Sequence, residues 1–447
     1  MTKNLIIAIL TLSIFLVPIL NILAESNNTQ IADKIQPPDK GREVSDMIPE
    51  DLREEFFKAA EKTANWLVAN QVQSWPDANN GRLLYTYTPA TGDYTYSDNW
   101  TTGVSIMGLL MMYHRTGDEK FKEAAILAGG YLKTMQILDE RDPVAFGAFR
   151  EITPQYTWCY PRDALTAAWG LLWLHEETGE QDYLYRVNVF IDWFKQNVMN
   201  GRWPLWQINF RGDPYMNINM EGSFHGGDGA FFYDYYRVTG DKSHLDDGLK
   251  FIADHFLERF LQEDGSLRIV WDREKKEYVC GVDDPQYPLG WQIMHRYNDD
   301  FGATTLMNAY LYYGDEKYLE GMKDFAGWLI SEQNDDGSFY KKPVAAGSAV
   351  APIELIDLYR ITKNRKYLDT AIKAGKHLLT LQETESKEKK MHGGFYGMTD
   401  NRHGTREMIN LRTTAYALIA LLKLEGKEKG PYYSVTDKDG KFHDLRE

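Results

Sequence analysis

Cysteine is almost absent from this chain of 447 residues, which holds only Cys159 and Cys280. Two thiols are too few for a disulfide-rich scaffold or for a metal centre built mainly from cysteine. A single bridge between them stays open in an oxidising compartment, because sequence alone does not show whether the two sulfurs meet. The fold must therefore rest on its hydrophobic core.

Basic residues are also in deficit, since 50 Lys and Arg stand against 65 Asp and Glu and leave a net charge of -15. A surface of this sign repels polyanion backbones, which argues against a nucleic-acid partner. Hydrophobic residues nevertheless make up 43% of the chain, and aromatic residues make up 13%. The core can be large, and the surplus of aromatic side chains indicates surface that contacts a ligand.

One long apolar run, residues 5–23, follows Lys3 and precedes Ala24 at the N-terminus. This pattern predicts a signal peptide over residues 1–24, with a retained membrane anchor as the alternative. Either reading places the protein outside the cytoplasm, as a secreted, periplasmic or cell-surface protein. Membrane contact is expected only if the segment is retained. We expect a polar linker over 25–48, one domain over 49–426 and a C-terminal tail over 427–447.

The domain repeats one pattern with a period of roughly 50–75 residues. Short turns containing Gly or Asn end one helix, and the residues after them form an amphipathic segment with apolar positions three and four apart. A Gly-x-apolar signal follows each amphipathic segment. The turns lie at 115–118, 177–180, 238–241, 313–316 and 362–365, and the signals begin at Gly81, Gly147, Gly201, Gly265, Gly337 and Gly393.

A second, more apolar helix rich in small residues follows each signal. Six pairs of this kind predict an all-α fold, a closed (α/α)6 toroid of six outer and six inner helices; an open solenoid is the alternative. The loops from outer to inner helices are long and share one face, where binding and catalysis concentrate. The inner helices are expected at 102–113, 164–175, 229–237, 303–312, 349–359 and 413–424.

Two charged residues, Arg162 and Asp163, stand at the start of the second inner helix. A guanidinium and a carboxylate there can hold sugar hydroxyls, and Asp163 is also a candidate acid or base. Helix capping by Asp163 is the alternative reading.

The third long loop carries Glu221, His225 and Asp228. His225 and Asp228 are candidates for a proton-transfer pair, and Glu221 and Asp228 are candidates for sugar binding. We expect no metal site and no cofactor, because no ligand triad at diagnostic spacing accompanies the histidine. A structural calcium held by loop carboxylates stays open.

The fourth long loop ends in adjacent carboxylates, Asp299 and Asp300. Crowded carboxylates raise the pKa of one member, which allows it to donate a proton to a leaving oxygen. The same stretch also supports elimination from a uronate, with Tyr297 or His225 as the base and Arg296 or Arg412 against the sugar carboxylate.

The last long loop is basic, with Arg402 and His403 ahead of Arg412, and suits an anionic ligand. Aromatic side chains add flat faces that stack on sugars. The aromatic candidates for sugar binding are Trp100, Trp158, Tyr160 and Trp291.

This architecture resembles the six-hairpin glycosidase-like toroids, exported enzymes that include glycoside hydrolases, polysaccharide lyases and epimerases. The Trp158-x-x-x-Arg162-Asp163 run looks like the sugar-holding Arg-Asp segment of glucoamylase-like enzymes. The pair Asp299-Asp300 looks like the Asp-Asp pair of endo-mannanase-type toroids. The repeat signature at 333–339 is similar to that of terpene cyclases, whose Asp-x-Asp-Asp motif is absent from this sequence.

The sequence thus predicts an enzyme that cleaves glycosidic bonds in a poly- or oligosaccharide, acidic glycans included. Asp163, Asp299 and Asp300 are its candidate catalytic carboxylates. A uronate lyase, a C5-epimerase and a non-catalytic glycan-binding toroid are the alternatives.

Overall fold

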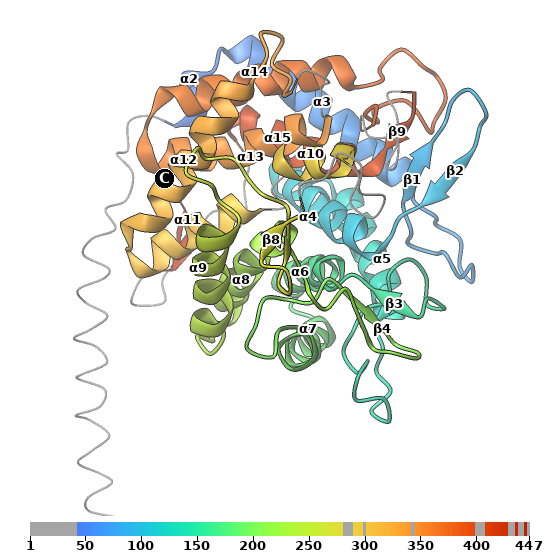
Figure 1. Ribbon diagram of the computed structural model, residues 1–447. Helices are drawn as coiled ribbons and strands as arrows, with labels where there is room; N and C mark the ends of the chain where they lie inside the picture. Colours follow the sequence, from blue (N-terminus) through green and yellow to red (C-terminus); the bar gives the residue numbers. More distant parts are fainter. Residues whose placement is uncertain are drawn as a thin grey trace, which may run out of the picture.

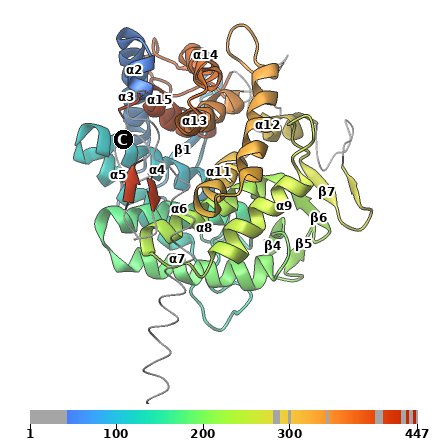
Figure 2. The ribbon, with the colours of Figure 1, turned by 90° about the vertical axis from the view of Figure 1, so that its left-hand side faces the viewer.

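The computed structural model describes residues 43–279, 289–297, 301–340, 345–397, 407–427, 434–436 and 442–444, and in this part of the chain helices alternate between two concentric layers (Figure 1). In Figure 2, α7, α9 and α12 lie toward the periphery with α8 and α11 inside them. The outer layer comprises α3 (Glu50–Ala69), α5 (Glu119–Met135), α7 (Gln181–Trp193), α9 (Phe251–Arg259), α12 (Glu316–Glu332) and α14 (Arg365–Leu381). The inner layer comprises α4 (Asn99–Thr116), α6 (Pro161–Thr178), α8 (Asp228–Thr239), α11 (Gly302–Tyr313), α13 (Ala345–Thr362) and α15 (Leu411–Glu425).

The inner helices close into a toroid, as the sequence predicts. Neighbouring inner helices pack in chain order, and the last, α15, packs on the first, α4, and on α3. The Gly-x-apolar signals explain this closure. At Gly337 a Cβ would lie 2.0 Å from the Lys373 carbonyl oxygen of the next outer helix, and at Gly393 it would lie 2.4 Å from the Lys62 oxygen of α3. The turn at Gly393 in the sixth repeat therefore packs on α3 of the first, just as the turn at Gly337 in the fifth repeat packs on α14 of the sixth.

Two glutamines make equivalent hydrogen bonds from one hairpin to the outer helix of the next. Gln333 donates to the Thr370 carbonyl oxygen of α14 at 2.9 Å, and Gln382 donates to the Ala59 oxygen of α3 at 2.9 Å. Because both bonds reach buried helix backbone, they fix the register of one hairpin against the next.

The short turns are built mostly as expected. Gly117 ends α4 with φ of 74° and Gly179 ends α6 with φ of 71°, the left-handed geometry that glycine tolerates. The fifth turn differs, because Lys363 takes the left-handed position with φ of 56° and Asn364 instead caps α14 by accepting from the Lys366 backbone N–H. The inner helices α4 and α6 begin earlier than predicted, at Asn99 and Pro161, because Asp98 caps α4 and Pro161 occupies the first turn of α6.

The fold is mostly helical, as predicted, and the long loops add short strands to it. They carry short antiparallel sheets: β1 (Leu84–Tyr87) pairs with both β2 (Tyr94–Tyr96) and β9 (Ile409–Asn410). The other strands are β3 (Trp158–Cys159), β4 (Gln207–Asn209), β5 (Tyr215–Met216), β6 (Met220–Gly222), β7 (Val270–Asp272), β8 (Glu277–Tyr278), β10 (Ser434–Thr436) and β11 (Phe442–Asp444). Further helical segments are α2 (Val44–Met47), α10 (Leu289–Tyr297), a 3-10 turn over Ser223–Gly227, and π-helical turns over Phe194–Met199 and Leu245–Lys250.

The last residues of the expected linker over 25–48, from residue 43 onward, belong to the folded domain. Helix α2 packs on α15, and Val44 and Ile48 are buried. Among the described residues, no helix combines the length and apolar character that a membrane span requires.

Candidate active site

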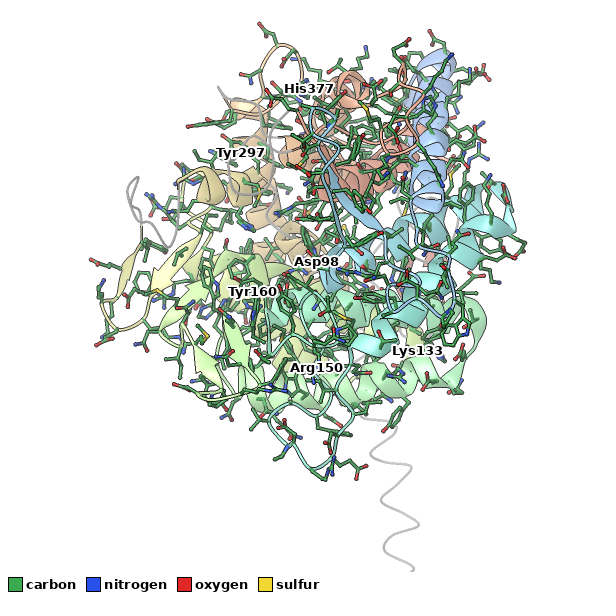
Figure 3. The ribbon with its side chains drawn as sticks, turned by 90° about the vertical axis from the view of Figure 1, so that its right-hand side faces the viewer. Asp98, Lys133, Arg150, Tyr160, Tyr297 and His377 are labelled. Carbon is green, nitrogen blue, oxygen red and sulfur yellow. The ribbon has the colours of Figure 1, made fainter. Side chains whose placement is uncertain are left out.

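Three carboxyl groups gather where the inner helices α4 and α6 begin. We call Asp98, Glu151 and Asp163 the carboxyl cluster. Asp98 caps α4, accepting from the Thr101 N–H at 2.8 Å and from its hydroxyl at 2.5 Å. Tyr160 leads into α6, and its N–H donates to Glu151 Oε2 at 2.8 Å. In Figure 3 Asp98 and Tyr160 lie together near the middle of this view of the molecule.

Glu151 and Asp163 share a hydrogen bond between their side chains. Glu151 is buried, whereas Asp163 is half-buried. Burial, the charge of Asp163 and this hydrogen bond together raise the pKa of Glu151 well above its usual range, and the charge of Asp98 adds to the effect. Glu151 is therefore the member of the pair that favours the protonated form, and it lies beside the half-buried carboxyl group of Asp163.

Burial and neighbouring polar groups shift the pKa of Asp98 in opposite directions. Burial raises its pKa, while the Thr101 hydrogen bonds and the charges of Arg412 and Arg82 oppose the rise. Arg412, on α15, stacks its guanidinium on the Trp100 indole with Cζ 4.6 Å from the centroid. Two predicted sugar-binding residues therefore form one unit beside a carboxyl group.

The raised pKa of Glu151 predicts a pH-dependent gain in stability for Glu151→Gln. Because the folded protein raises this pKa, the native state binds more protons than the unfolded chain, and wild-type stability falls as pH rises above the usual carboxyl range. The variant amide keeps the bonds to Tyr160 and Asp163 without that loss. We expect Tm values to match at acidic pH and the variant to melt higher at neutral and mildly alkaline pH, as measured by thermal scans across this range. A gap that does not widen with pH would contradict the assignment.

A second constellation, the predicted pair His225 and Asp228, lies at the start of α8. His225 Nδ1 is 2.6 Å from Asp228 Oδ2, and both side chains are fully buried. Arg162 Nε donates to the Phe224 carbonyl oxygen at 3.0 Å and lies 3.9 Å from Asp228 Oδ1. Within the described ranges, His225 Nε2 makes no hydrogen bond. Arg162 thus lies beside this histidine–aspartate dyad, whereas its neighbour Asp163 belongs to the carboxyl cluster.

Aromatic side chains line the approach to the carboxyl cluster. Trp158 and Tyr160 meet edge to face at 5.0 Å and are both half-buried. Trp100 contacts Tyr416 at 6.3 Å. The half-buried faces of Trp158 and Tyr160 beside hydrogen-bonding carboxyls suit a sugar, whereas Trp100 is buried.

Two predicted site residues have structural partners instead. Glu221 is buried in an ion cluster with His255 and Arg273; burial alone would raise its pKa, but hydrogen bonds from these two residues lower it. The Tyr297 hydroxyl donates to Glu332 of α12 at 2.8 Å and its ring stacks on Trp328.

Burial and this bond raise the pKa of Tyr297, which disfavours the phenolate form that a base would need. In Figure 3 Tyr297 stands apart from Asp98 and Tyr160. Arg296, beside it, is half-buried.

Several predicted residues lie outside the described residues, namely Asp299, Asp300, Arg402, His403 and Cys280; the backbone of Trp291 belongs to α10, but its side chain is outside them too. Cys159 is a buried, free thiol. In the part of the chain that the structure describes, no group of three or more His, Cys, Asp or Glu side chains is placed to hold a metal ion.

The sequence analysis missed Asp98 and Glu151. Asp98 reads as an ordinary helix cap, and Glu151 sits in a loop with no helical pattern around it. The available signal was position: Glu151 closely follows the second Gly-x-apolar site, whose residues 147–149 anchor the long loop to the toroid.

Comparison with known proteins places the fold and leaves the chemistry open. No family model matches the chain, and no curated protein matches its sequence. Among solved structures, a sugar epimerase from a ruminal bacterium is 13% identical with a TM-score of 0.65, covering 83% of this chain and 98% of that one. Cellobiose 2-epimerase from Bacillus thermoamylovorans B4167 is 14% identical with a TM-score of 0.64, covering 84% of this chain and 100% of that one.

The GH76A α-1,6-mannanase from Salegentibacter sp. HEL1_6 is 15% identical with a TM-score of 0.57, covering 83% of this chain and 98% of that one. An inactive variant of that mannanase, with two adjacent aspartates replaced by alanine, has been solved in complex with α-1,6-mannotetrose. At such identities these matches define the fold, which is that of the six-hairpin (α/α)6 toroids.

Proposed function

We propose that this protein is an exported glycoside hydrolase that acts on a poly- or oligosaccharide at the carboxyl cluster. The observation that carries the proposal is the hydrogen-bonded pair in which burial and the neighbouring half-buried Asp163 raise the pKa of Glu151. Glycosidase chemistry needs a carboxylic acid that stays protonated near neutral pH.

In this reaction the acid proton passes to the glycosidic oxygen as the bond to the anomeric carbon breaks. Asp163 is the member exposed enough to reach that oxygen, and Glu151 behind it supplies and recovers the proton. A second carboxylate must activate water or attack the anomeric carbon. Asp98 is available within the cluster, and Asp299 and Asp300 are the candidates from the sequence. Trp100 with Arg412, and Trp158 with Tyr160, would hold the sugar.

Product analysis tests the proposal directly. The protein is incubated with α-1,6-mannan and with polygalacturonate, one neutral and one acidic polymer, and reducing ends are counted over time. We expect reducing ends to accumulate on at least one polymer without absorbance from unsaturated sugars. Absence of new reducing ends across a broad polysaccharide panel would overturn hydrolysis.

The histidine–aspartate dyad supports a second candidate, epimerisation or elimination by removal of a carbon-bound proton. His225 Nε2 lacks a hydrogen-bond partner among the described residues, as a base awaiting a substrate proton would, and Arg162 sits beside Asp228. Sugar epimerases also share the fold.

Reaction in D2O followed by NMR separates the two candidates. A hydrolase leaves sugar C–H positions unlabelled, whereas an epimerase introduces deuterium at the inverted carbon. A lyase generates an unsaturated, ultraviolet-absorbing end. A purely binding toroid would produce none of these signals.

A further inference from the structure

Two of the most exposed aromatic side chains of the described structure lie in the first long loop. The side chain of Trp75 is 86% exposed and that of Tyr94 is 49% exposed. An indole gains much from leaving water, so one held almost entirely in solvent indicates a contact surface.

The turn that carries Trp75 is ordered by its own hydrogen bonds. The Asp77 N–H donates to the Ser74 carbonyl oxygen at 2.6 Å, and the Ser74 N–H donates to Asn80 Oδ1 at 2.9 Å. Trp75 lies at the corner between these residues, which presents its indole outward on a fixed support.

Arg82 joins this turn to the β1–β2 hairpin. Its Nη1 donates to Asn79 Oδ1 at 3.0 Å, and its Cζ lies 5.4 Å from the centre of the Tyr96 ring. The charge of Asp77 also acts on the Tyr96 hydroxyl, which places the Trp75 turn beside β2.

The hairpin presents further aromatic surface. Tyr94 and Tyr96, two residues apart and so on one side of β2, meet edge to face at 5.6 Å. Tyr87 is paired with Tyr94, and the Lys390 ammonium lies over both rings, 5.6 Å and 5.1 Å from their centres. We call Trp75, Tyr87, Tyr94, Tyr96 and Lys390 the hairpin aromatic surface.

This surface leads into the carboxyl cluster along the chain itself. Strand β2 ends at Tyr96, and Asp98 follows two residues later. Tyr94 is four residues from Asp98, a span of about 13 Å in an extended chain. In Figure 1 the β1–β2 hairpin projects from the edge of the molecule beside β9.

We propose that the hairpin aromatic surface binds the units of a polysaccharide that lie beyond the unit reacting at the carboxyl cluster. Flat rings stack on the C–H faces of sugars, and the Lys390 ammonium and tyrosine hydroxyls bond to hydroxyl or carboxylate groups. The natural substrate is therefore a polymer rather than a mono- or disaccharide. This inference rests on the proposed function, because it takes the carboxyl cluster as the reacting centre.

Affinity electrophoresis in gels containing α-1,6-mannan or polygalacturonate tests the surface without requiring turnover. The variants Trp75→Ala/Tyr94→Ala and Tyr185→Ala are each made in the Asp163→Asn protein. Tyr185 is a matched control, because it is 50% exposed but lies on outer helix α7. We expect the double variant to raise Kd for the retarding polymer by about 10-fold or more, and the control to leave it unchanged.

Equal retardation of the double variant and its parent would overturn the proposal, as would absence of retardation by either polymer. Circular dichroism checks that the double variant is folded, which its exposed positions favour. If hydrolysis is observed, the double variant in the otherwise unaltered protein should raise KM for the polymer and leave kcat on a short oligosaccharide unchanged. Failure of the hydrolase proposal would instead appear as full activity of Asp163→Asn or as absence of cleavage, with the retardation result unaffected.

Discussion

Asp163→Asn is expected to lower kcat on the cleaved glycan by about 10²–10⁴-fold, the usual contribution of a positioned acid or base. The oxygen of the variant amide can still accept from Glu151, so the cluster keeps its packing. It cannot pass a proton to the glycosidic oxygen. The measurement is the initial rate of reducing-end release at saturating polymer, with KM expected to change little because the residue acts mainly on the transition state.

Asp192→Asn is the matched control, since Asp192 is exposed on outer helix α7. It should retain wild-type kcat. If Asp163→Asn also retains it while the fold is intact, the carboxyl cluster is not the reacting centre. The histidine–aspartate dyad would then become the better candidate.

Gly393→Ala is expected to lower the free energy of unfolding by about 2–5 kcal/mol, combining left-handed backbone strain with overpacking. Gly393 has φ of 94°, and its added Cβ would lie 2.4 Å from the Lys62 carbonyl oxygen of α3. Neither the turn nor the helix backbone can yield without loosening the joint between the last and first hairpins. Urea unfolding followed by far-ultraviolet circular dichroism measures the change.

Gly130→Ala supplies the comparison. Gly130 lies inside α5 with no atom within 4 Å of an added Cβ, so alanine should be neutral or stabilise by up to about 1 kcal/mol. Two variants with equal stability would show that Gly393 does not form a critical joint.

Much of the fold could be predicted because its determinants are local and repeated. Helix periodicity, the Gly-containing turns and the Gly-x-apolar signals each act within a few residues, and six repetitions make the pattern unmistakable. Gly337 contacts Lys373 of the next outer helix, whereas Gly393 contacts Lys62 at the other end of the domain, and this closure follows from the repeat. The short strands were missed because pairs such as β1 with β9 depend on contacts between distant loops.

The candidate site was only partly predictable. Helix starts made Arg162, Asp163 and Arg412 candidates, because the N-terminal ends of the inner helices share one face of the toroid. The protonation of Glu151 depends on burial and on Asp163, which local sequence does not encode.

Glu221 and Tyr297 were assigned to the site by residue type. Their true partners, Arg273 and Glu332, come from other parts of the chain.

The contact between α2 and the end of α15 sets the face on which the described chain enters the toroid. Gly426, after α15, lies against Ser45 of α2, with an added Cβ only 2.8 Å from the Ser45 nitrogen. This contact is at the C-terminal end of an inner helix, whereas the carboxyl cluster is at the N-terminal ends. The first described residue and the carboxyl cluster therefore lie on opposite faces of the toroid, so the long-loop face stays clear of the point where the chain enters the fold.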